Sequence, residues 1–383
     1  MLIYAGLLSV VLAFTTNWLA LIPWRRAKDR HWTERARVCH PVRTAASSNL
    51  WMLPAVLTMT WLLLWPKDSP HWALMLIVTA IGAVLGTIPM DHEVFARVPL
   101  NKLLHQIVLG WLFRFLMWFV FLAAITLMPE EFNQLTVIIA VAVVALCIVW
   151  TRDGWIQVGK RVGLFLPPTE RLQNIVRDTA ARMNIPLNEL WLIRAPWAQA
   201  FAMPGKRKLL FSERLLEILS DDEIAAVSAH ELAHLSEARS DYFKRYVLWL
   251  TFLPWIFFKP LVHKFDLAGF VILLLSTVLV PSFYRRVSRK LEMRADDVAK
   301  SNEPDKGAYA RALARLYEDN LLPAVNPKRK ATHPHLYDRL LAAGVTPDFP
   351  RPAPAALMAW HGFLFAFLLG ILATLLILRL TQF

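Results

Sequence analysis

The stretch "AVSAHELAHLSEARSD", Ala226–Asp241, places two histidines four residues apart and a glutamate directly after the first. Just before it, Ser220 and Glu223 have the spacing of a helix capping box. Apolar residues recur with the helical period, at Ile224, Val227, Leu232 and Leu235. The pattern predicts a helix from about Asp221 to Arg239, and the polar part of the chain is expected to fold around it.

The two histidines would lie on one face of this helix, because residues four apart are separated by about one turn. Two imidazoles at this spacing are suited to binding a zinc ion, and an adjacent carboxylate is suited to accepting a proton from a water molecule. His230 and His234 are therefore candidate metal ligands, and Glu231 is a candidate general base. HExxH also arises by chance, so a third ligand is needed to strengthen the hypothesis.

The best candidate for that third ligand lies in "RKLEMRADDVAK", Arg289–Lys300. Catalytic zinc sites usually take three protein ligands and leave one position open, and Glu292 could supply the third. Asp296 lies one helical turn later, where it could hydrogen-bond the second nitrogen of a zinc-binding imidazole. The alternative interpretation is a solvated helix next to the membrane, in which these acids pair with neighbouring Arg and Lys residues.

The composition indicates a membrane protein. Of the 383 residues, 56% are hydrophobic and only 19% are charged, and the mean hydropathy is +0.42. The formal net charge of +13 is better explained by basic cytoplasmic loops and contacts with anionic lipid than by nucleic-acid binding. Nucleic acid is therefore not expected as a partner, whereas the lipid bilayer is.

Eight apolar runs approach the length needed to cross a bilayer, which is about 20 residues. They run roughly over 1–24, 49–65, 71–90, 106–128, 132–150, 246–262, 267–284 and 355–378. Lys and Arg concentrate in the loops after the first and third runs, and such residues favour the cytoplasmic side. The prediction is eight spans with both termini outside the cytoplasm and the two long polar stretches inside it.

This count divides the chain into five regions. They are an N-terminal membrane region with five spans, 1–150; a cytoplasmic catalytic part with the HExxH helix, 151–245; two spans, 246–284; a second cytoplasmic catalytic part with the third ligand, 285–354; and a C-terminal span, 355–383. The predicted fold class is mainly α, a polytopic helical bundle with a cytoplasmic α+β catalytic domain.

Four motifs in order resemble a known family. HExxH is followed by two apolar runs and then ExxAD, and it is preceded by "QAFAMPGKRKLLFSERLLEILSDD", Gln199–Asp222. The late segment "THPHLYDRLLAAG", Thr332–Gly344, completes the set. Residues 168–344 thereby resemble the integral-membrane zinc metallopeptidases that include the HtpX proteases and the type I CAAX prenyl endopeptidases.

The resemblance implies a zincin-type catalytic domain of the gluzincin class, with one zinc ion held by His230, His234 and Glu292. Glu231 would be the catalytic base, and Asp296 would support a ligand. By the same resemblance, His333 would stabilise the oxyanion and Arg339 would support the site. The chain departs from the family at Gln199, where asparagine is usual, so the contacts made by that amide are expected to differ.

Short strands are predicted at Leu190–Pro196, Ala200–Pro204 and Arg207–Ser212. An exposed strand edge there could bind an extended peptide, and the expected substrate-binding residues are Gln199, Ala200, Phe201 and Ala202. The pattern leaves open which strand forms the edge.

The predicted activity is zinc-dependent cleavage of membrane or lipid-anchored proteins at the cytoplasmic face, in quality control or processing, in a bacterial inner membrane. The alternative is a non-catalytic scaffold or transporter-like protein with a structural zinc.

Overall fold

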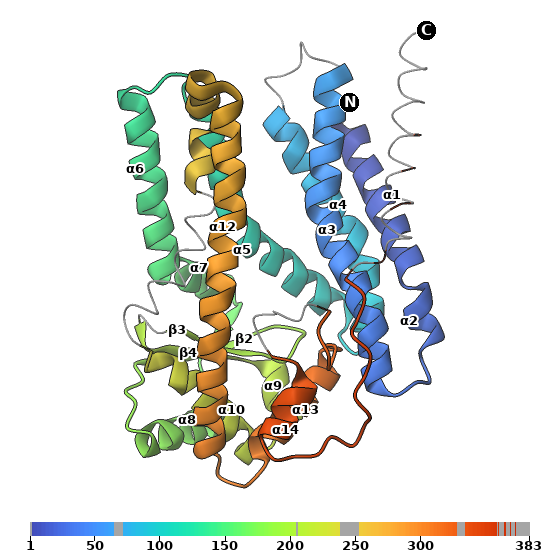
Figure 1. Ribbon diagram of the computed structural model, residues 1–383, viewed down its shortest axis with the longest axis vertical. Coiled ribbons are helices and arrows are strands. Elements are labelled where there is room, and N and C mark those ends of the chain that lie inside the picture. Colours follow the sequence, from blue (N-terminus) through green and yellow to red (C-terminus); the bar gives the residue numbers. More distant parts are fainter. Residues whose placement is uncertain are drawn as a thin grey trace. The chain divides into compact units, whose positions relative to one another are not determined.

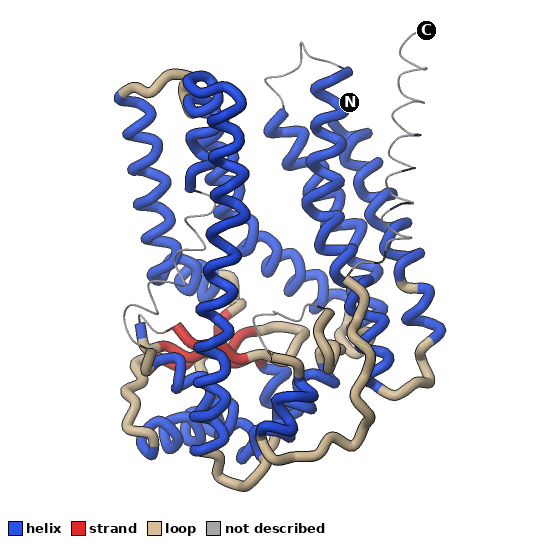
Figure 2. Tube along the Cα trace, in the orientation of Figure 1, coloured by secondary structure: helices blue, strands red, loops and turns tan. Residues whose placement is uncertain are grey.

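Helices make up most of the fold, and one small sheet accompanies them (Figures 1 and 2). The computed structural model describes residues 2–64, 72–203, 206–237, 253–327 and 334–357, and the single positions 359, 364, 368 and 372. The chain divides into two compact units. Unit 1 comprises Met1–Trp111, Leu321–Pro327 and Arg351–Phe383, and unit 2 comprises Leu112–Asn320 and Lys328–Pro350. The predicted mainly helical fold class is confirmed.

Unit 1 is built on the N-terminal helices, which are α1 (Leu2–Ala20), α2 (Ile22–Arg26), α3 (Trp32–Leu64), α4 (Trp72–Val94) and the start of α5 (Leu100–Leu127). Helices α1 and α4 pack closely because glycines lie where they meet. A Cβ atom at Gly82 would lie 2.4 Å from the carbonyl oxygen of Gly6, and one at Gly86 would lie 2.5 Å from that of Val10. Larger side chains at these positions would force the two helices apart.

Two stretches in the described part of the chain are both long and apolar enough to cross a membrane, Leu2–Arg26 and Trp72–Val94. They correspond to the first and third predicted spans. Two shorter apolar helices, Leu116–Leu127 and Gln134–Val149, lie within the fourth and fifth. The full count of eight spans is therefore not shown by the structure.

Helix α3 differs from the expected loop followed by a short span. It runs without interruption for 33 residues, through both the polar stretch and the apolar run, and contains Pro41 and Pro54. The polar half is helical because it also has an inward face, where Ala36, Cys39 and Val42 are buried. The charged residues of this stretch led to the prediction of a loop, whereas the stretch is a packed helix with one buried face.

Unit 2 contains the rest of α5, the sheet and further described helical segments, among them a short π-helix, Trp150–Gly154. Its α-helices are α6 (Gln134–Val149), α7 (Trp155–Arg161), α8 (Glu170–Arg182), α9 (Glu213–Ile218), α10 (Asp221–Leu235), α12 (Phe258–Ser301), α13 (Ala308–Asp319) and α14 (Leu336–Ala342). A 3-10 helix, Leu253–Phe257, precedes α12. Helix α12 changes course at Asp266, which has a φ of 46°, close to the turn predicted between the sixth and seventh spans.

The sheet has four strands, β1 (Phe165–Leu166), β2 (Glu189–Ile193), β3 (Ala200–Met203) and β4 (Lys208–Ser212), in the order β1-β2-β4-β3. Strands β2 and β4 are parallel, whereas β3 pairs antiparallel with β4, with Ala200 opposite Phe211. The three predicted strands are thus confirmed. The sheet order also answers the question that the sequence left open, because β3 is an end strand of the sheet.

A hydrophobic core joins this sheet to α8 and α10, which lie together beside the strands in Figure 1. Leu172 and Val176 of α8, Leu209 and Phe211 of β4, and Ile224 and Leu232 of α10 are all fully or almost fully buried in it. The core therefore fixes α10, which carries the HExxH motif, against the sheet.

Candidate metal centre

Helix α10 begins with the capping box that the sequence predicts. The Ser220 side chain accepts a hydrogen bond from the Glu223 backbone, and the Glu223 carboxylate accepts one from the Ser220 backbone. Every residue from Glu223 to Leu235 is buried. The helix packs against β3, β4, α8, α12 and α13. Such a helix holds its side chains in a rigid setting.

Three side chains converge where α10 meets α12. The Nε2 atoms of His230 and His234 lie 3.3 Å apart. Glu292 comes from α12, and its carboxylate oxygens lie 3.6 Å from His230 Nε2 and 3.7 Å from His234 Nε2. All three residues are buried. The structure therefore brings the three candidate ligands together, although Glu292 follows His230 by 62 positions in the sequence.

These distances fit a zinc ion. Ligand atoms about 2.0–2.1 Å from a tetrahedral metal lie about 3.3 Å from one another, close to the observed 3.3, 3.6 and 3.7 Å. The donor set of two imidazoles and one carboxylate is also that of a catalytic zinc site. Among the described residues, this is the group of His, Cys, Asp and Glu side chains that could hold a metal ion.

The outer nitrogen of His230 lies in a buried hydrogen-bond network. Its Nδ1 atom is 2.8 Å from the Tyr309 hydroxyl and 3.2 Å from Asp296 Oδ1. Arg339 donates to both oxygens of Asp296, at 2.7 and 2.6 Å, and to the Tyr309 hydroxyl at 2.8 Å. Asp296 thus lies next to a candidate ligand, and Arg339 contacts Asp296 and Tyr309 behind it.

Burial and charge act in opposite directions on this network. Burial of His230 opposes its protonation, but hydrogen bonds with Asp296 and Glu292 and the charge of Glu231 prevail and raise its pKa to about 9. Burial of Asp296 is likewise outweighed by its hydrogen bonds with His230 and Arg339, which lower its pKa to about 2. Burial raises the pKa of Tyr309 well above its ordinary value, so its hydroxyl keeps its proton.

The outer nitrogen of His234 has a local partner. Its Nδ1 atom lies 2.6 Å from Oε1 of Glu237, three residues further along the chain. Both side chains are almost completely buried. Each histidine therefore has a carboxylate behind it, as is usual for metal-binding imidazoles.

Strand β3 carries three of the four expected substrate-binding residues, Ala200, Phe201 and Ala202. Gln199 precedes it and is held through its backbone, which exchanges hydrogen bonds with the side chain and backbone of Ser212. One residue earlier, Asn320 at the end of α13 bonds both the N–H and the carbonyl of Ala198, at 2.9 and 2.6 Å. The end strand is therefore anchored from two sides at its start, and it packs against the metal-site helix.

One expected site residue, His333, lies outside the described residues. Conversely, Tyr309, Glu237 and Asn320 were not predicted from the sequence. Glu237 could have been found, because it follows His234 at helical spacing within the opening stretch. Tyr309 and Asn320 gave no such signal, since they lie 79 and 122 residues from the groups that they contact.

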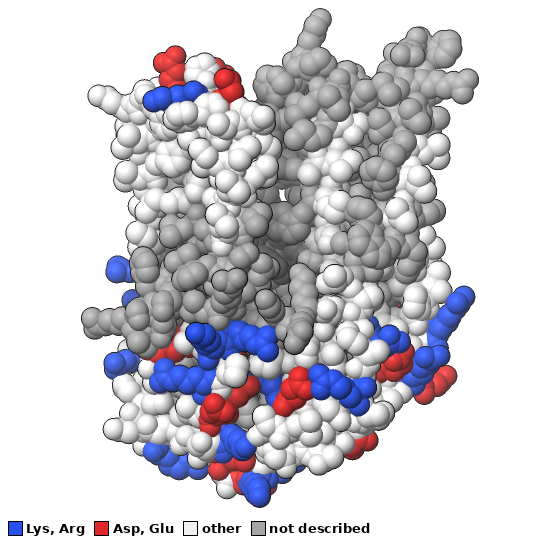
Figure 3. Space-filling view, in the orientation of Figure 1, with Lys and Arg blue, Asp and Glu red and all other residues white. Residues whose placement is uncertain are grey.

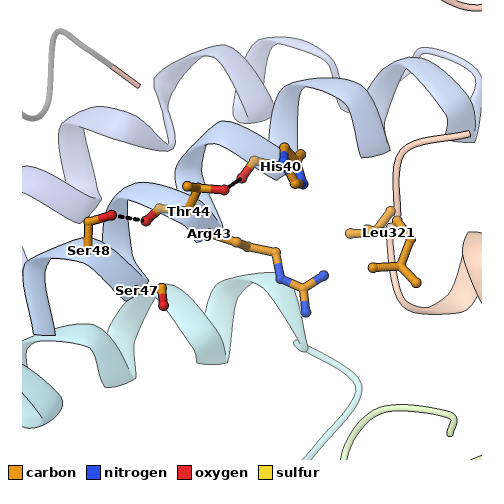
Figure 4. A pocket seen from close by; sticks show the side chains of 7 residues that line it. His40, Arg43, Thr44, Ser47, Ser48 and Leu321 are labelled. Atoms are coloured by element: carbon orange, nitrogen blue, oxygen red, sulfur yellow. Dashed lines mark hydrogen bonds between the residues drawn. The ribbon is translucent and has the colours of Figure 1, made fainter. Parts of the chain in front are cut away.

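A separate pocket of about 330 Å³ lies in unit 1, between α3 and the segment that follows α13 (Figure 4). Its lining comprises His40, Arg43, Thr44, Ser47, Ser48, Leu321 and Leu322. None of these residues belongs to the candidate metal centre.

Comparison with known proteins agrees with this geometry. Residues 167–344 match the sequence profile of "Peptidase family M48". Two curated relatives named "Protease HtpX homolog" are each 37% identical, one from Aquifex aeolicus over 67 residues and one from Trichormus variabilis over 68. The matched segment covers 17% of this chain in both cases, but only 22% and 24% of the relatives. Residues 167–344, which contain the converging His230, His234 and Glu292, are therefore similar to the peptidases of family M48, and part of this chain is similar to the proteases named HtpX homolog.

Proposed function

We propose that this protein is an integral-membrane zinc metalloendopeptidase. The observation that carries the proposal is the convergence of His230, His234 and Glu292, with Glu231 on the same buried turn of α10. A structural zinc site has no use for a carboxylate beside its ligands, whereas a hydrolytic site needs one as a base. The names of the relatives support the same activity.

The residues of the chain have distinct proposed roles in peptide cleavage. His230, His234 and Glu292 would hold the zinc ion, which when bound lowers the pKa of a water molecule from 15.7 to about 7. Glu231 accepts the proton of the attacking water and returns it to the leaving amine. By the family resemblance, His333 stabilises the negative charge that develops on the carbonyl oxygen.

We propose that the substrate lies extended beside β3. This strand is at the end of the sheet, so a peptide can add to it through backbone hydrogen bonds. Gln199, Ala200, Phe201 and Ala202 would then run alongside the substrate. Anchoring of the strand by Asn320 and Ser212 supports this role, because a fixed edge holds the scissile bond in one register.

Unit 2 also carries features expected of a protein in lipid. On α6, Val137, Ile138 and Val141 are each 62% exposed, and on α12 Leu267 is 73% and Leu279 62% exposed. Figure 3 shows a largely uncharged surface along these helices, with charged residues at their upper ends and again across the lower part of the unit, around α8, α9 and α14. Exposed apolar surface of this extent indicates contact with lipid or with another apolar surface.

Helix α12 carries both part of this exposed apolar surface and Glu292. Glu292 lies 13 residues after Leu279 on one helix, which corresponds to about 20 Å along the axis. We therefore propose that the site works at the membrane surface, on membrane proteins or lipid-anchored chains, in quality control or processing. The full proposed topology has eight spans, both termini outside and the catalytic part in the cytoplasm, in a bacterial inner membrane.

The Glu231→Gln variant tests the proposed function. We expect the purified variant to bind one zinc per chain, as the wild type does, but to have lost cleavage of a membrane-protein substrate. Glu170→Gln, at the exposed start of α8, is the matched control and should cleave normally. Unchanged cleavage by Glu231→Gln would reject the proposed chemistry, and zinc binding without cleavage by the wild type would favour the scaffold alternative.

A further inference from the structure

The hydroxyl of Tyr309 lies between a candidate metal ligand and the carboxylate that supports it. It is 2.8 Å from His230 Nδ1 and 2.6 Å from Asp296 Oδ1. The direct distance from His230 Nδ1 to Asp296 Oδ1 is longer, 3.2 Å. Each of the two hydrogen bonds through the tyrosine oxygen is therefore shorter than the direct contact between His230 and Asp296.

The protons of this network can be assigned from its donors and acceptors. Arg339 has only N–H groups, so its 2.8 Å contact with Tyr309 uses the tyrosine oxygen as an acceptor. Both oxygens of Asp296 accept hydrogen bonds from Arg339, so Asp296 is an acceptor here, and its 2.6 Å contact requires the tyrosine O–H as the donor. The single hydroxyl proton of Tyr309 is then committed to Asp296.

This assignment decides the protonation of His230. Because the Tyr309 proton points to Asp296, the 2.8 Å contact with His230 is a hydrogen bond only if His230 Nδ1 is the donor. A neutral imidazole with its proton on Nδ1 has a free electron pair on Nε2. Nε2 is the atom that faces His234 and Glu292. The opposite tautomer would place a proton where a metal must bind.

We propose that Tyr309 is a positioning residue that links Asp296 to His230 and fixes the tautomer of His230 in which Nε2 can bind a metal. The order of hydrogen bonds is His230 Nδ1–H to the Tyr309 oxygen, and Tyr309 O–H to Asp296. The proposal rests on the metal site of the proposed function. It gives Asp296 an indirect action on the ligand in addition to its longer direct contact.

The packing around Tyr309 is suited to this role. Its ring is buried and stacks on the His230 imidazole, with ring centroids 5.7 Å apart and an angle of 20° between the planes. Arg339 holds the same hydroxyl and the same carboxylate, so the oxygen has little freedom to move. The stacked ring also explains why phenylalanine is a fair test, because it keeps the contact and removes only the hydroxyl.

A double-mutant cycle on zinc affinity tests the proposal with the full-length protein in detergent. Tyr309→Phe and Asp296→Asn are each expected to weaken zinc binding by about 10- to 100-fold, the usual range for partners of metal ligands. If Tyr309 and Asp296 act through one chain of hydrogen bonds, their effects should not multiply. The zinc affinity of the double variant should then be within about threefold of that of the single variant with the lower affinity. Tyr337→Phe, whose ring packs on Phe349, is the control and should bind zinc normally.

The outcomes separate this proposal from the proposed function. Tyr309→Phe with wild-type zinc affinity, or losses that multiply in the double variant, would overturn the role of Tyr309, whereas a wild type that binds no zinc would reject the metal site itself. A changed visible spectrum of cobalt-loaded Tyr309→Phe would support an effect on ligand geometry beyond folding. If the variant does not fold, nitrogen-15 spectra of metal-free wild type, recorded above pH 9 where His230 is neutral, decide. A protonated Nδ1 on His230 supports the proposal, and a protonated Nε2 overturns it.

Discussion

The two histidines of the proposed zinc site are supported in different ways. His234 has a carboxylate only three residues away on the chain, Glu237, and the two form a local pair. His230 depends on side chains from three other helices, with Asp296 from α12, Tyr309 from α13 and Arg339 from α14. The first arrangement exists once α10 and the turn after it form. The second requires α12, α13 and α14 to be assembled with α10.

This difference indicates how folding and metal binding are coupled in the protein. Residues 230–237 could hold a metal ion weakly on their own, because two imidazoles and one outer carboxylate are local. A tight site requires Glu292 from α12 and the network behind His230, so it forms only when α12 and α13 have packed on α10 and α14 has packed on α13. Zinc binding should therefore stabilise the assembled unit as a whole.

The largest effect is expected from Glu292→Ala, which removes the one ligand that the distant region supplies. Only the local pair of histidines would remain, and zinc affinity should fall by more than the roughly 100-fold that loss of an outer partner costs. Zinc content after dialysis and cleavage of a membrane-protein substrate would measure it. Glu318→Ala, on the exposed face of α13, is the control. Full retention of zinc by Glu292→Ala would show that the convergence of the three side chains is not a metal site.

The same contrast explains what the sequence could and could not predict. The capping box, the HExxH face and the short strands depend on neighbouring residues, and the structure has them where the pattern placed them. Glu292 and Asp296 were found because they lie in a motif of their own. Tyr309 was missed, because its ring occupies a buried position of an amphipathic helix, where a tyrosine is ordinarily a core residue.

The membrane-facing part of the chain was harder to predict. Hydropathy finds apolar runs, but it does not find the inward face of a charged stretch, so the polar half of α3 was mistaken for a loop. It also does not determine how many runs cross a membrane, since this depends on packing between helices. The motif-rich segment was predicted more accurately because a metal site requires particular residue types at particular spacings. Contact with lipid requires only that the side chains be apolar.

A smaller effect is expected when the partners of the two histidines are compared directly. Glu237→Gln and Asp296→Asn should each weaken zinc binding by about 10- to 100-fold. Only Asp296→Asn should also lower the melting temperature markedly, because it leaves the buried Arg339 without its charged partner. Asp297→Asn, the exposed neighbour of Asp296, is the matched control. Equal melting temperatures for the two site variants would mean that the distant network contributes no more to the fold than the local pair.

The smallest expected effect is a dependence of stability on pH that arises from the protonation of His230. The folded-state pKa of His230 is about 9, above the ordinary value of about 6.5. Protonated His230 therefore stabilises metal-free protein fully below pH 6.5, and this stabilisation is lost as the pH rises through about 9. Zinc competes with that proton, because a ligand imidazole must be deprotonated. The gap between the melting temperatures of zinc-loaded and metal-free protein should thus widen from pH 6.5 to pH 9.

Scanning fluorimetry of the two forms in detergent would measure this gap. Asp296→Asn should reduce the widening, since the hydrogen bond with Asp296 is the leading cause that raises the pKa of His230. Asp297→Asn should leave it unchanged. A gap that stays constant over this range in the wild type would mean that His230 carries no extra proton in the metal-free protein. The distant network would then orient the imidazole without changing its charge, and the two histidines would differ only in geometry.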